Sequence, residues 1–189
     1  LILKTPILNE IEFKKLKSQD RVPIKCFDII FETDFDDFEI TKQNLVSTLD
    51  KLCHEIALFA KKSGGIVILS DINITKENAP IPMILATSAI NQYLIDNGLR
   101  MNVSLVLETG QVSSSHHVSC ALGFGASALF PFSVSLRAKE KFHNDPDIAF
   151  NSFTKATEKA LLKTMGKVGL CTVESYIGGE FFEPNFLNT

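Results

Sequence analysis

The sequence predicts an α/β fold, in which parallel β-strands alternate with crossover helices. Two observations lead to this prediction. Short runs rich in β-branched and aromatic residues recur along the chain, and longer stretches with apolar residues at spacings of three and four lie between them. The length, 189 residues, suits one ordinary domain. We therefore expect residues 1–189 to form a single domain.

The first strand and helix are the clearest of these pairs. The first expected strand covers residues 26–33 and leads into an acidic loop. Thr41 is the expected N-cap of the following helix, whose apolar positions recur at helical spacing up to Lys62. Gly64 and Gly65 then predict the end of this helix, because glycine tolerates the left-handed conformation found there.

The later elements follow from the same rules. Residues 66–70 form a continuous apolar run, which is typical of a parallel strand covered on both faces. Residues 139–146 predict a turn-rich connection, and residues 1–25 and 176–189 lack a strand pattern and are expected to be packing arms. We further expect strands over residues 102–107, 128–130 and 169–173, and helices from Pro80 or Pro82 to Gly98, from Ser113 or Ser114 to Gly123, and from Asp147 to Met165.

The number of strands limits the architecture. Five strands with crossover helices indicate a parallel sheet with right-handed connections, either doubly wound or part of a barrel. A complete eight-stranded barrel typically needs roughly 250 residues, so it does not fit this length. The prediction is an open sheet or a partial, rudimentary TIM-barrel-like fold.

Composition excludes several classes of function. Hydrophobic residues make up 45% of the chain, and no apolar run approaches the ~18 residues of a membrane span. The net charge of -3, with scattered Lys and Arg, predicts neither a nucleic-acid partner nor a membrane partner. The four cysteines lie far apart without metal-site spacing, so we expect reduced thiols in the cytoplasm or in an organelle matrix. The chain begins with Leu, and we expect it to be part of a longer polypeptide.

Polar residues follow the expected strands at the edge where chemistry concentrates in α/β folds. These residues are Glu32 and Asp34, Ser70 and Asp71, Glu108 and Thr109, and Glu174 and Ser175. Carboxylates on one rim can perform acid–base chemistry or bind a cation. They also cap the helices that follow and stabilise the N-terminal helix dipoles, and we favour this structural interpretation.

His116 and His117 are adjacent on an expected helix. Their side chains therefore point about 100° apart and are unsuited to holding one metal ion, so we expect no metal site. If the chain were an independent enzyme, the candidate catalytic residues would be Asp71, Glu108, His116 and His117. Gly123 and Gly125 match a G-x-G-x-x-A string, but they follow a helix and precede a strand, which is the reverse of a dinucleotide-binding motif.

Several blocks of the sequence resemble the large subunit of glutamate synthase, in the same order and at similar separations. The blocks are residues 79–87, 97–100, 103–110, 115–117, 122–126, 130–131, 160–165 and 169–176. Residues 176–183 depart from the expected pattern and lack an arginine found there in the family. The resemblance covers most of residues 66–183 and is faint before that.

The resemblance implies a role within a larger oxidoreductase. The family assimilates ammonia by converting glutamine and 2-oxoglutarate to glutamate. It uses an N-terminal amidotransferase domain, a central domain, an FMN-binding barrel with an iron–sulfur cluster, and a C-terminal β-helix. This chain is similar to the central domain, which implies partners in the neighbouring amidotransferase and FMN domains. No cofactor site and no catalytic residue can be transferred to these residues, so we expect a structural, linking domain. The alternative is a stand-alone small-molecule enzyme.

Overall fold

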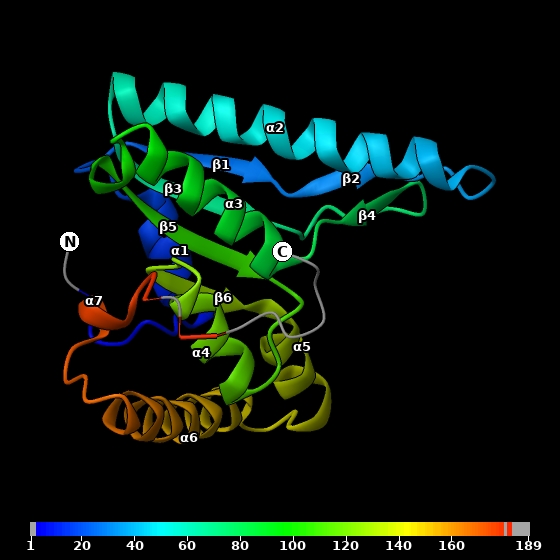
Figure 1. Cartoon of the computed structure of the whole chain (residues 1–189). Coiled ribbons are helices and arrows are strands. Elements are labelled where there is room, and N and C mark those ends of the chain that lie inside the picture. The colour runs from blue at the N-terminus through cyan, green and yellow to red at the C-terminus, as the bar shows by residue number, and fades with distance from the viewer. Residues whose placement is uncertain (1–2, 180, 183–189) are drawn as a thin grey trace.

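A parallel sheet forms the centre of the computed structural model, which describes residues 3–179 and 181–182. Within this sheet, each strand pairs in parallel with the sheet strand that follows it in the sequence, so the order of the strands in space is the same as their order along the chain (Figure 1). Doubly wound sheets reverse their strand order, whereas barrels keep it sequential. The predicted partial TIM-barrel-like fold is therefore confirmed. The strands are β1 (Ile24–Asp28), β3 (Gly65–Ser70), β5 (Val103–Thr109) and β6 (Ala128–Pro131).

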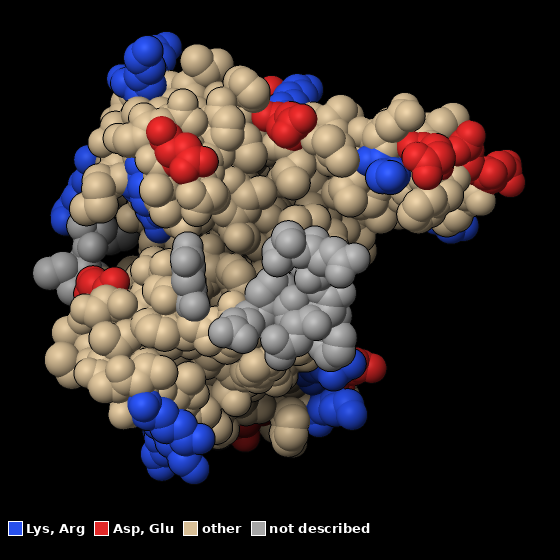
Figure 2. All heavy atoms as spheres, viewed as in Figure 1, with Lys and Arg blue, Asp and Glu red and all other residues tan. Residues whose placement is uncertain are grey.

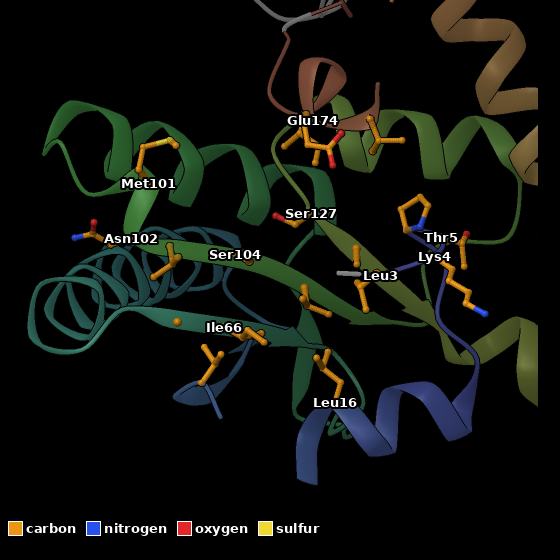
Figure 3. Close-up of a pocket in the computed structure, with 18 residues that line it drawn as sticks. Leu3, Lys4, Thr5, Leu16, Ile66, Met101, Asn102, Ser104, Ser127 and Glu174 are labelled. Atoms are coloured by element: carbon orange, nitrogen blue, oxygen red, sulfur yellow. The ribbon is translucent and has the colours of Figure 1, made fainter. Parts of the chain in front are cut away.

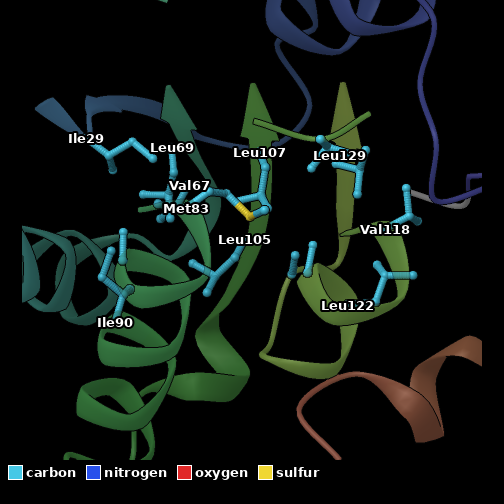
Figure 4. Close-up of a cluster of buried hydrophobic side chains, with 14 of the residues drawn as sticks. Ile29, Val67, Leu69, Met83, Ile90, Leu105, Leu107, Val118, Leu122 and Leu129 are labelled. Carbon is cyan, nitrogen blue, oxygen red and sulfur yellow. The ribbon is translucent and has the colours of Figure 1, made fainter. Parts of the chain in front are cut away.

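Three helices cover one face of the sheet, where the main hydrophobic core lies (Figure 4). They are α2 (Phe38–Lys62), α3 (Met83–Asp96) and α4 (Ser115–Gly123). Strand residues such as Val67, Leu69 and Leu107 are fully buried against them because alternate side chains of each strand point to this face. Two further helices pack beyond α4, namely α5 (Phe132–Lys141) and α6 (Pro146–Lys167).

The opposite face of the sheet is covered by α1 (Glu10–Ser18), a helix that sequence analysis did not predict. Phe13 of α1 stacks on Phe130 of β6, with ring centroids 4.9 Å apart. Leu16 packs against the same face. In a closed barrel this face would be the interior. A helix from the N-terminal segment therefore fills the space that the missing strands of a barrel would enclose.

The chain also caps one edge of the sheet with its own N-terminal segment. Ile7 forms a parallel bridge with Leu129, and the backbone N–H of Leu129 donates to the carbonyl of Pro6 at 2.8 Å. The expected strand over residues 169–173 is wrong, because this segment forms a loop that leads into α7 (Val173–Tyr176). Gly169 has a φ of +79°, which breaks an extended run, and the edge beside β6 is already occupied.

The first expected strand divides in two at Ile29. The N–H of Ile29 donates to Ser70, in the main sheet, and its carbonyl accepts from Ile81, so the chain leaves one sheet and enters another. The second sheet is a two-stranded antiparallel pair of β2 (Ile30–Glu32) and β4 (Asn78–Pro80).

Two other boundaries differ from the prediction. Asp37, not Thr41, caps α2, because its carboxylate accepts hydrogen bonds from the N–H groups of Glu39 and Ile40. Residues 132–141, which include the start of the expected connection 139–146, form α5. The predicted stop at Gly64 and the cap at Ser114 are confirmed. No helix in the described part of the chain is long and apolar enough to cross a membrane.

The aromatic residues near the C-terminus fold back onto the domain. The ring of Phe181 stacks on Tyr176 with centroids 5.2 Å apart, and Phe182 packs against Phe124 at 6.0 Å and against the main core. Phe186 lies outside the described residues.

Candidate functional site

The carboxyl ends of three strands bring polar side chains together on the face covered by α1. Asp28, Ser70 and Glu108 occupy neighbouring register positions. The hydroxyl of Ser70 donates to Glu108 Oε2 at 2.9 Å, and Lys17 Nζ of α1 lies 3.4 Å from the same oxygen. The Glu108 side chain is only 8% exposed, so this carboxylate is held by a strand on one side and by α1 on the other.

Cys26 lies two residues before Asp28 on β1 and is exposed on the same face. Partial desolvation by its neighbours raises the pKa of its thiol above the usual value, an effect that nearby Lys17 opposes. The thiol is therefore protonated near neutral pH. Since the thiolate is the reactive form of cysteine, Cys26 is not activated as a nucleophile.

The Asp71 side chain is buried at this rim, where it forms hydrogen bonds with the neighbouring loop and does not point into an open site. The residue is 3% exposed, and its carboxylate accepts three hydrogen bonds. The donors are the hydroxyl of Thr109 at 2.6 Å, the N–H of Gly110 at 2.8 Å and the side-chain amide of Gln111 at 2.8 Å. Gln111 also accepts from the N–H of Met83, the first residue of α3. Asp71 therefore ties the exit loop of β3 to that of β5 and, through Gln111, to α3.

The two histidines lie apart from these carboxylates. His117 Nδ1 accepts from the backbone N–H of Ser113 at 3.3 Å, and His116 Nε2 lies 3.5 Å from the sulfur of Cys120. No hydrogen bond within the described residues joins either ring to Asp71 or Glu108. The same residues contain no group of three or more His, Cys, Asp or Glu side chains placed to hold a metal. The four candidates therefore do not converge on one reacting centre.

Sequence reasoning missed Lys17, Gln111 and Arg100. Lys17 is 91 residues from its partner Glu108, so no local signal connects them. The Arg100 guanidinium donates to Asn91 and to the carbonyls of Val103 and Gly125. These contacts join α3, the start of β5 and the turn before β6, which explains an arginine in the block of residues 97–100.

A cavity of about 680 Å³ lies at the other end of the strands, on the face covered by α1 (Figure 3). Its lining includes Leu16 of α1, Ile66 and Ser104 at the strand starts, Ser127 before β6, and Glu174 of α7. The cavity is distant along the strands from Asp71 and Glu108, which lie at the carboxyl ends of β3 and β5. Glu174 was expected at the carboxyl rim, but it lines this cavity at the opposite end because residues 169–173 form no strand. None of the four candidate catalytic residues, Asp71, Glu108, His116 and His117, lies in the lining.

The G-x-G-x-x-A string has the structural context expected of a turn. Gly123 ends α4, and Gly125, with a φ of +114°, precedes β6. A Cβ on Gly125 would lie 2.5 Å from the side chain of Asn91, which itself accepts from Arg100. Glycine is therefore required here by backbone conformation and by close packing.

A profile of the glutamate synthase central domain matches residues 1–187. This chain belongs to the glutamate synthase central domain family. The central domain is 34% identical to the ferredoxin-dependent glutamate synthase of Cyanidium caldarium, over 97% of this chain and 13% of that protein. It is 30% identical to the glutamate synthase [NADPH] large chain of Bacillus subtilis, over 96% of this chain and 12% of that one. The resemblance inferred from sequence blocks is confirmed, and the central domain spans about an eighth of the length of these two relatives.

Solved structures support the fold. A flavocytochrome b2 variant with benzoylformate matches 91% of this central domain and 38% of its own chain, with a TM-score of 0.55 and 14% identity. A second variant, with sulfite bound, matches 90% of the central domain and 38% of its own chain, with a TM-score of 0.54. At this identity the likeness concerns the fold alone.

Proposed function

We propose that this central domain is a structural part of a glutamate synthase, the enzyme that converts glutamine and 2-oxoglutarate to glutamate in ammonia assimilation. It would hold the amidotransferase domain and the FMN domain of the same polypeptide in a fixed relation, without catalysis of its own. Family membership supports this proposal, as does the length of the relatives, of which such a domain is a small part. We expect it in the cytoplasm or in an organelle matrix, and the rice and Arabidopsis relatives include proteins named chloroplastic.

The observation that carries the proposal is the position of α1. In TIM barrels the active site lies at the carboxyl ends of the strands, within loops and inward-facing side chains. In this domain the inward-facing side chains at these strand ends are covered by α1, whose Phe13 and Lys17 contact Phe130 and Glu108. A flavin at this place would have to displace the helix and break a buried stacking contact. The residues present therefore do not fit FMN, the cofactor of the parent family.

The rim residues are engaged in holding the fold together. Asp71 accepts three hydrogen bonds from the last residue of β5 and the loop after it, and Glu108 is shared between Ser70 and Lys17. The alternative, a stand-alone enzyme that uses Asp71, Glu108, His116 and His117, has weaker support because these side chains do not share one cavity. His116 is exposed, so its replacement by alanine should leave folding intact and would abolish activity only under the alternative.

A titration of the isolated 189-residue chain with FMN tests the proposal. A ligand that binds only the folded state adds about 2.7 kcal/mol of stability at a hundred times its Kd, which is a measurable rise in Tm. We expect no saturable change in flavin fluorescence, no rise in Tm and no glutamine hydrolysis. The same titration with the chain unfolded in urea controls for non-specific quenching. Stoichiometric FMN binding or glutamine turnover would overturn the proposal.

A further inference from the structure

A projecting arm extends from the body of the domain (Figure 1). We define the arm as residues 30–41 and 72–80, which comprise β2, β4, the loops beside them and the first turn of α2. The two strands pair only with each other in the described structure, in a sheet separate from the main one. The arm therefore contributes little to the central core and presents its surface outward.

The tip of the arm exposes two large aromatic side chains. Phe35 is 85% exposed and Phe38 is 77% exposed, more than any other described phenylalanine. Ile40 and Ile74 are also exposed on the arm. Single exposed apolar residues are ordinary, but a group that includes two nearly free phenylalanines on one projection is typical of a binding surface.

Hydrogen bonds within the loop hold these rings outward. Asp34 Oδ1 accepts from the N–H groups of Asp36 and Asp37, at 2.9 and 3.1 Å. Thr41 Oγ1 donates to the carbonyl of Asp34 and accepts from its N–H, both at 2.8 Å. The loop is thus ordered by its own polar groups and not by burial of the phenylalanines. A preordered loop loses little conformational entropy when it binds.

The tip also concentrates negative charge. Residues 32–39 contain five acidic side chains and no Lys or Arg, whereas the whole chain has a net charge of -3. Figure 2 shows acidic residues gathered at this end of the molecule. The opposite end carries α6, on which exposed lysines recur every four residues at Lys155, Lys159, Lys163 and Lys167. Lys42 pairs with Glu39 at 3.7 Å, and Lys76 is the one basic residue of the arm, so part of the negative charge is offset. Six acidic residues against one basic residue still leave the arm with an excess of negative charge, which favours a basic partner.

We propose that the arm docks into an apolar pocket bordered by Lys and Arg on a neighbouring domain of the same polypeptide. Phe35 and Phe38 are the apolar anchors, and Asp36 and Glu39 lie at the rim. Interfaces commonly combine aromatic anchors at the centre with charges at the edge. The inference rests on the proposed linking function and adds the surface through which one link is made. The two relatives are long enough to contain such a neighbouring domain, since the central domain spans only 13% of one and 12% of the other.

Hydroxyl-radical footprinting, read out residue by residue by mass spectrometry, tests the proposal. It compares the isolated 189-residue chain with the complete polypeptide that contains it. Labelling of the urea-unfolded forms provides the reference that corrects both samples for differences in radical dose. We expect labelling of Phe35 and Phe38 to fall about tenfold in the complete polypeptide, as for exposed rings that become desolvated anchors. The double variant F35S/F38S should restore labelling of the partner pocket. Its Tm as an isolated chain should stay unchanged, because both rings are exposed.

The matched control is Leu162→Ser on α6, which removes a 63% exposed side chain at the opposite end of the domain. This variant should leave the protection of Phe35 and Phe38 intact. The charge variant D36K/E39K should weaken that protection, and the loss should be greatest at low ionic strength, where surface charges are least screened.

Three outcomes would overturn the proposal, and they have different meanings. If another surface is protected while Phe35 and Phe38 are labelled as before, the linking function stands and the arm is not the link. If protection depends on protein concentration and extends to the α6 lysines, the partner is a second copy. If no residue differs in labelling between the isolated and complete proteins, the linking function itself fails.

Discussion

Replacement of Asp71 by asparagine measures how much this buried rim carboxylate contributes to the stability of the fold. The side chain keeps its volume but exchanges one acceptor oxygen for an NH2 donor. Oδ1 accepts from the N–H of Gly110, and Oδ2 accepts from Thr109 and Gln111. In either orientation, the new NH2 group faces at least one donor that has lost its acceptor.

The magnitude follows from these bonds. A buried donor left without a partner costs about 1–3 kcal/mol, and bonds to a charged acceptor contribute more than neutral ones. We therefore expect Asp71→Asn to lower the free energy of unfolding by about 2–4 kcal/mol. Asp71→Ala removes all three acceptor contacts and should cost more than Asp71→Asn.

Urea unfolding of the isolated chain, followed by far-UV circular dichroism, measures this loss. Circular dichroism is preferable to intrinsic fluorescence because the sequence contains no Trp. With a slope of about 2 kcal/mol per molar urea, the midpoint should fall by about 1–2 M. Asp36→Asn is the matched control, since it makes the same chemical change on an exposed residue and should leave the midpoint in place. A midpoint of Asp71→Asn equal to that of the wild type would refute a structural role for Asp71.

Three further predictions concern other titratable or polar groups. Lys139 holds the pKa of Glu10 at about 2, so the ion pair stabilises the fold above pH 4.5 and is lost as pH falls toward 2. Because the Glu10 side chain is one-third exposed, Glu10→Gln should cost less than about 1 kcal/mol at pH 7 and only a small part of that near pH 2, measured by urea unfolding at both pH values. The buried Tyr176 hydroxyl lies near Ser119 but forms no hydrogen bond of good geometry in the described residues, since the Ser119 hydroxyl donates to the carbonyl of Ser115. Tyr176→Phe should therefore leave the Tm unchanged or raise it, and a fall would contradict this reasoning. Burial raises the pKa of Cys53 to about 11, so a thiol reagent at pH 8 should label exposed Cys171 in the folded chain and Cys53 only after unfolding, as peptide mapping would show.

Much of the local structure was determined by the sequence itself. The apolar run 66–70 is a buried strand, Gly64 and Gly65 end a helix, and Ser114 caps the next one, because each signal acts over a few residues. The rim position of Asp71 and Glu108 also follows from sequence, since the ends of parallel strands meet at one edge. The same argument was wrong for Glu32 and Asp34, which lie on the second sheet and its loop, and for Glu174, which lies on α7. The family, too, was identifiable from ordered sequence blocks.

Contacts between distant segments were decided only by the tertiary structure. The edge of β6 pairs with the segment around Ile7 and not with residues 169–173, because strand pairing depends on which segment reaches the edge in space. The helix α1 covers the inner face of the sheet, and its Lys17 meets Glu108, 91 residues away. Adjacent rim carboxylates thereby acquire different surroundings, since Glu108 faces α1 whereas Asp71 faces the loop after β5. Local periodicity determines which elements form, and packing determines what each polar side chain at the rim contacts.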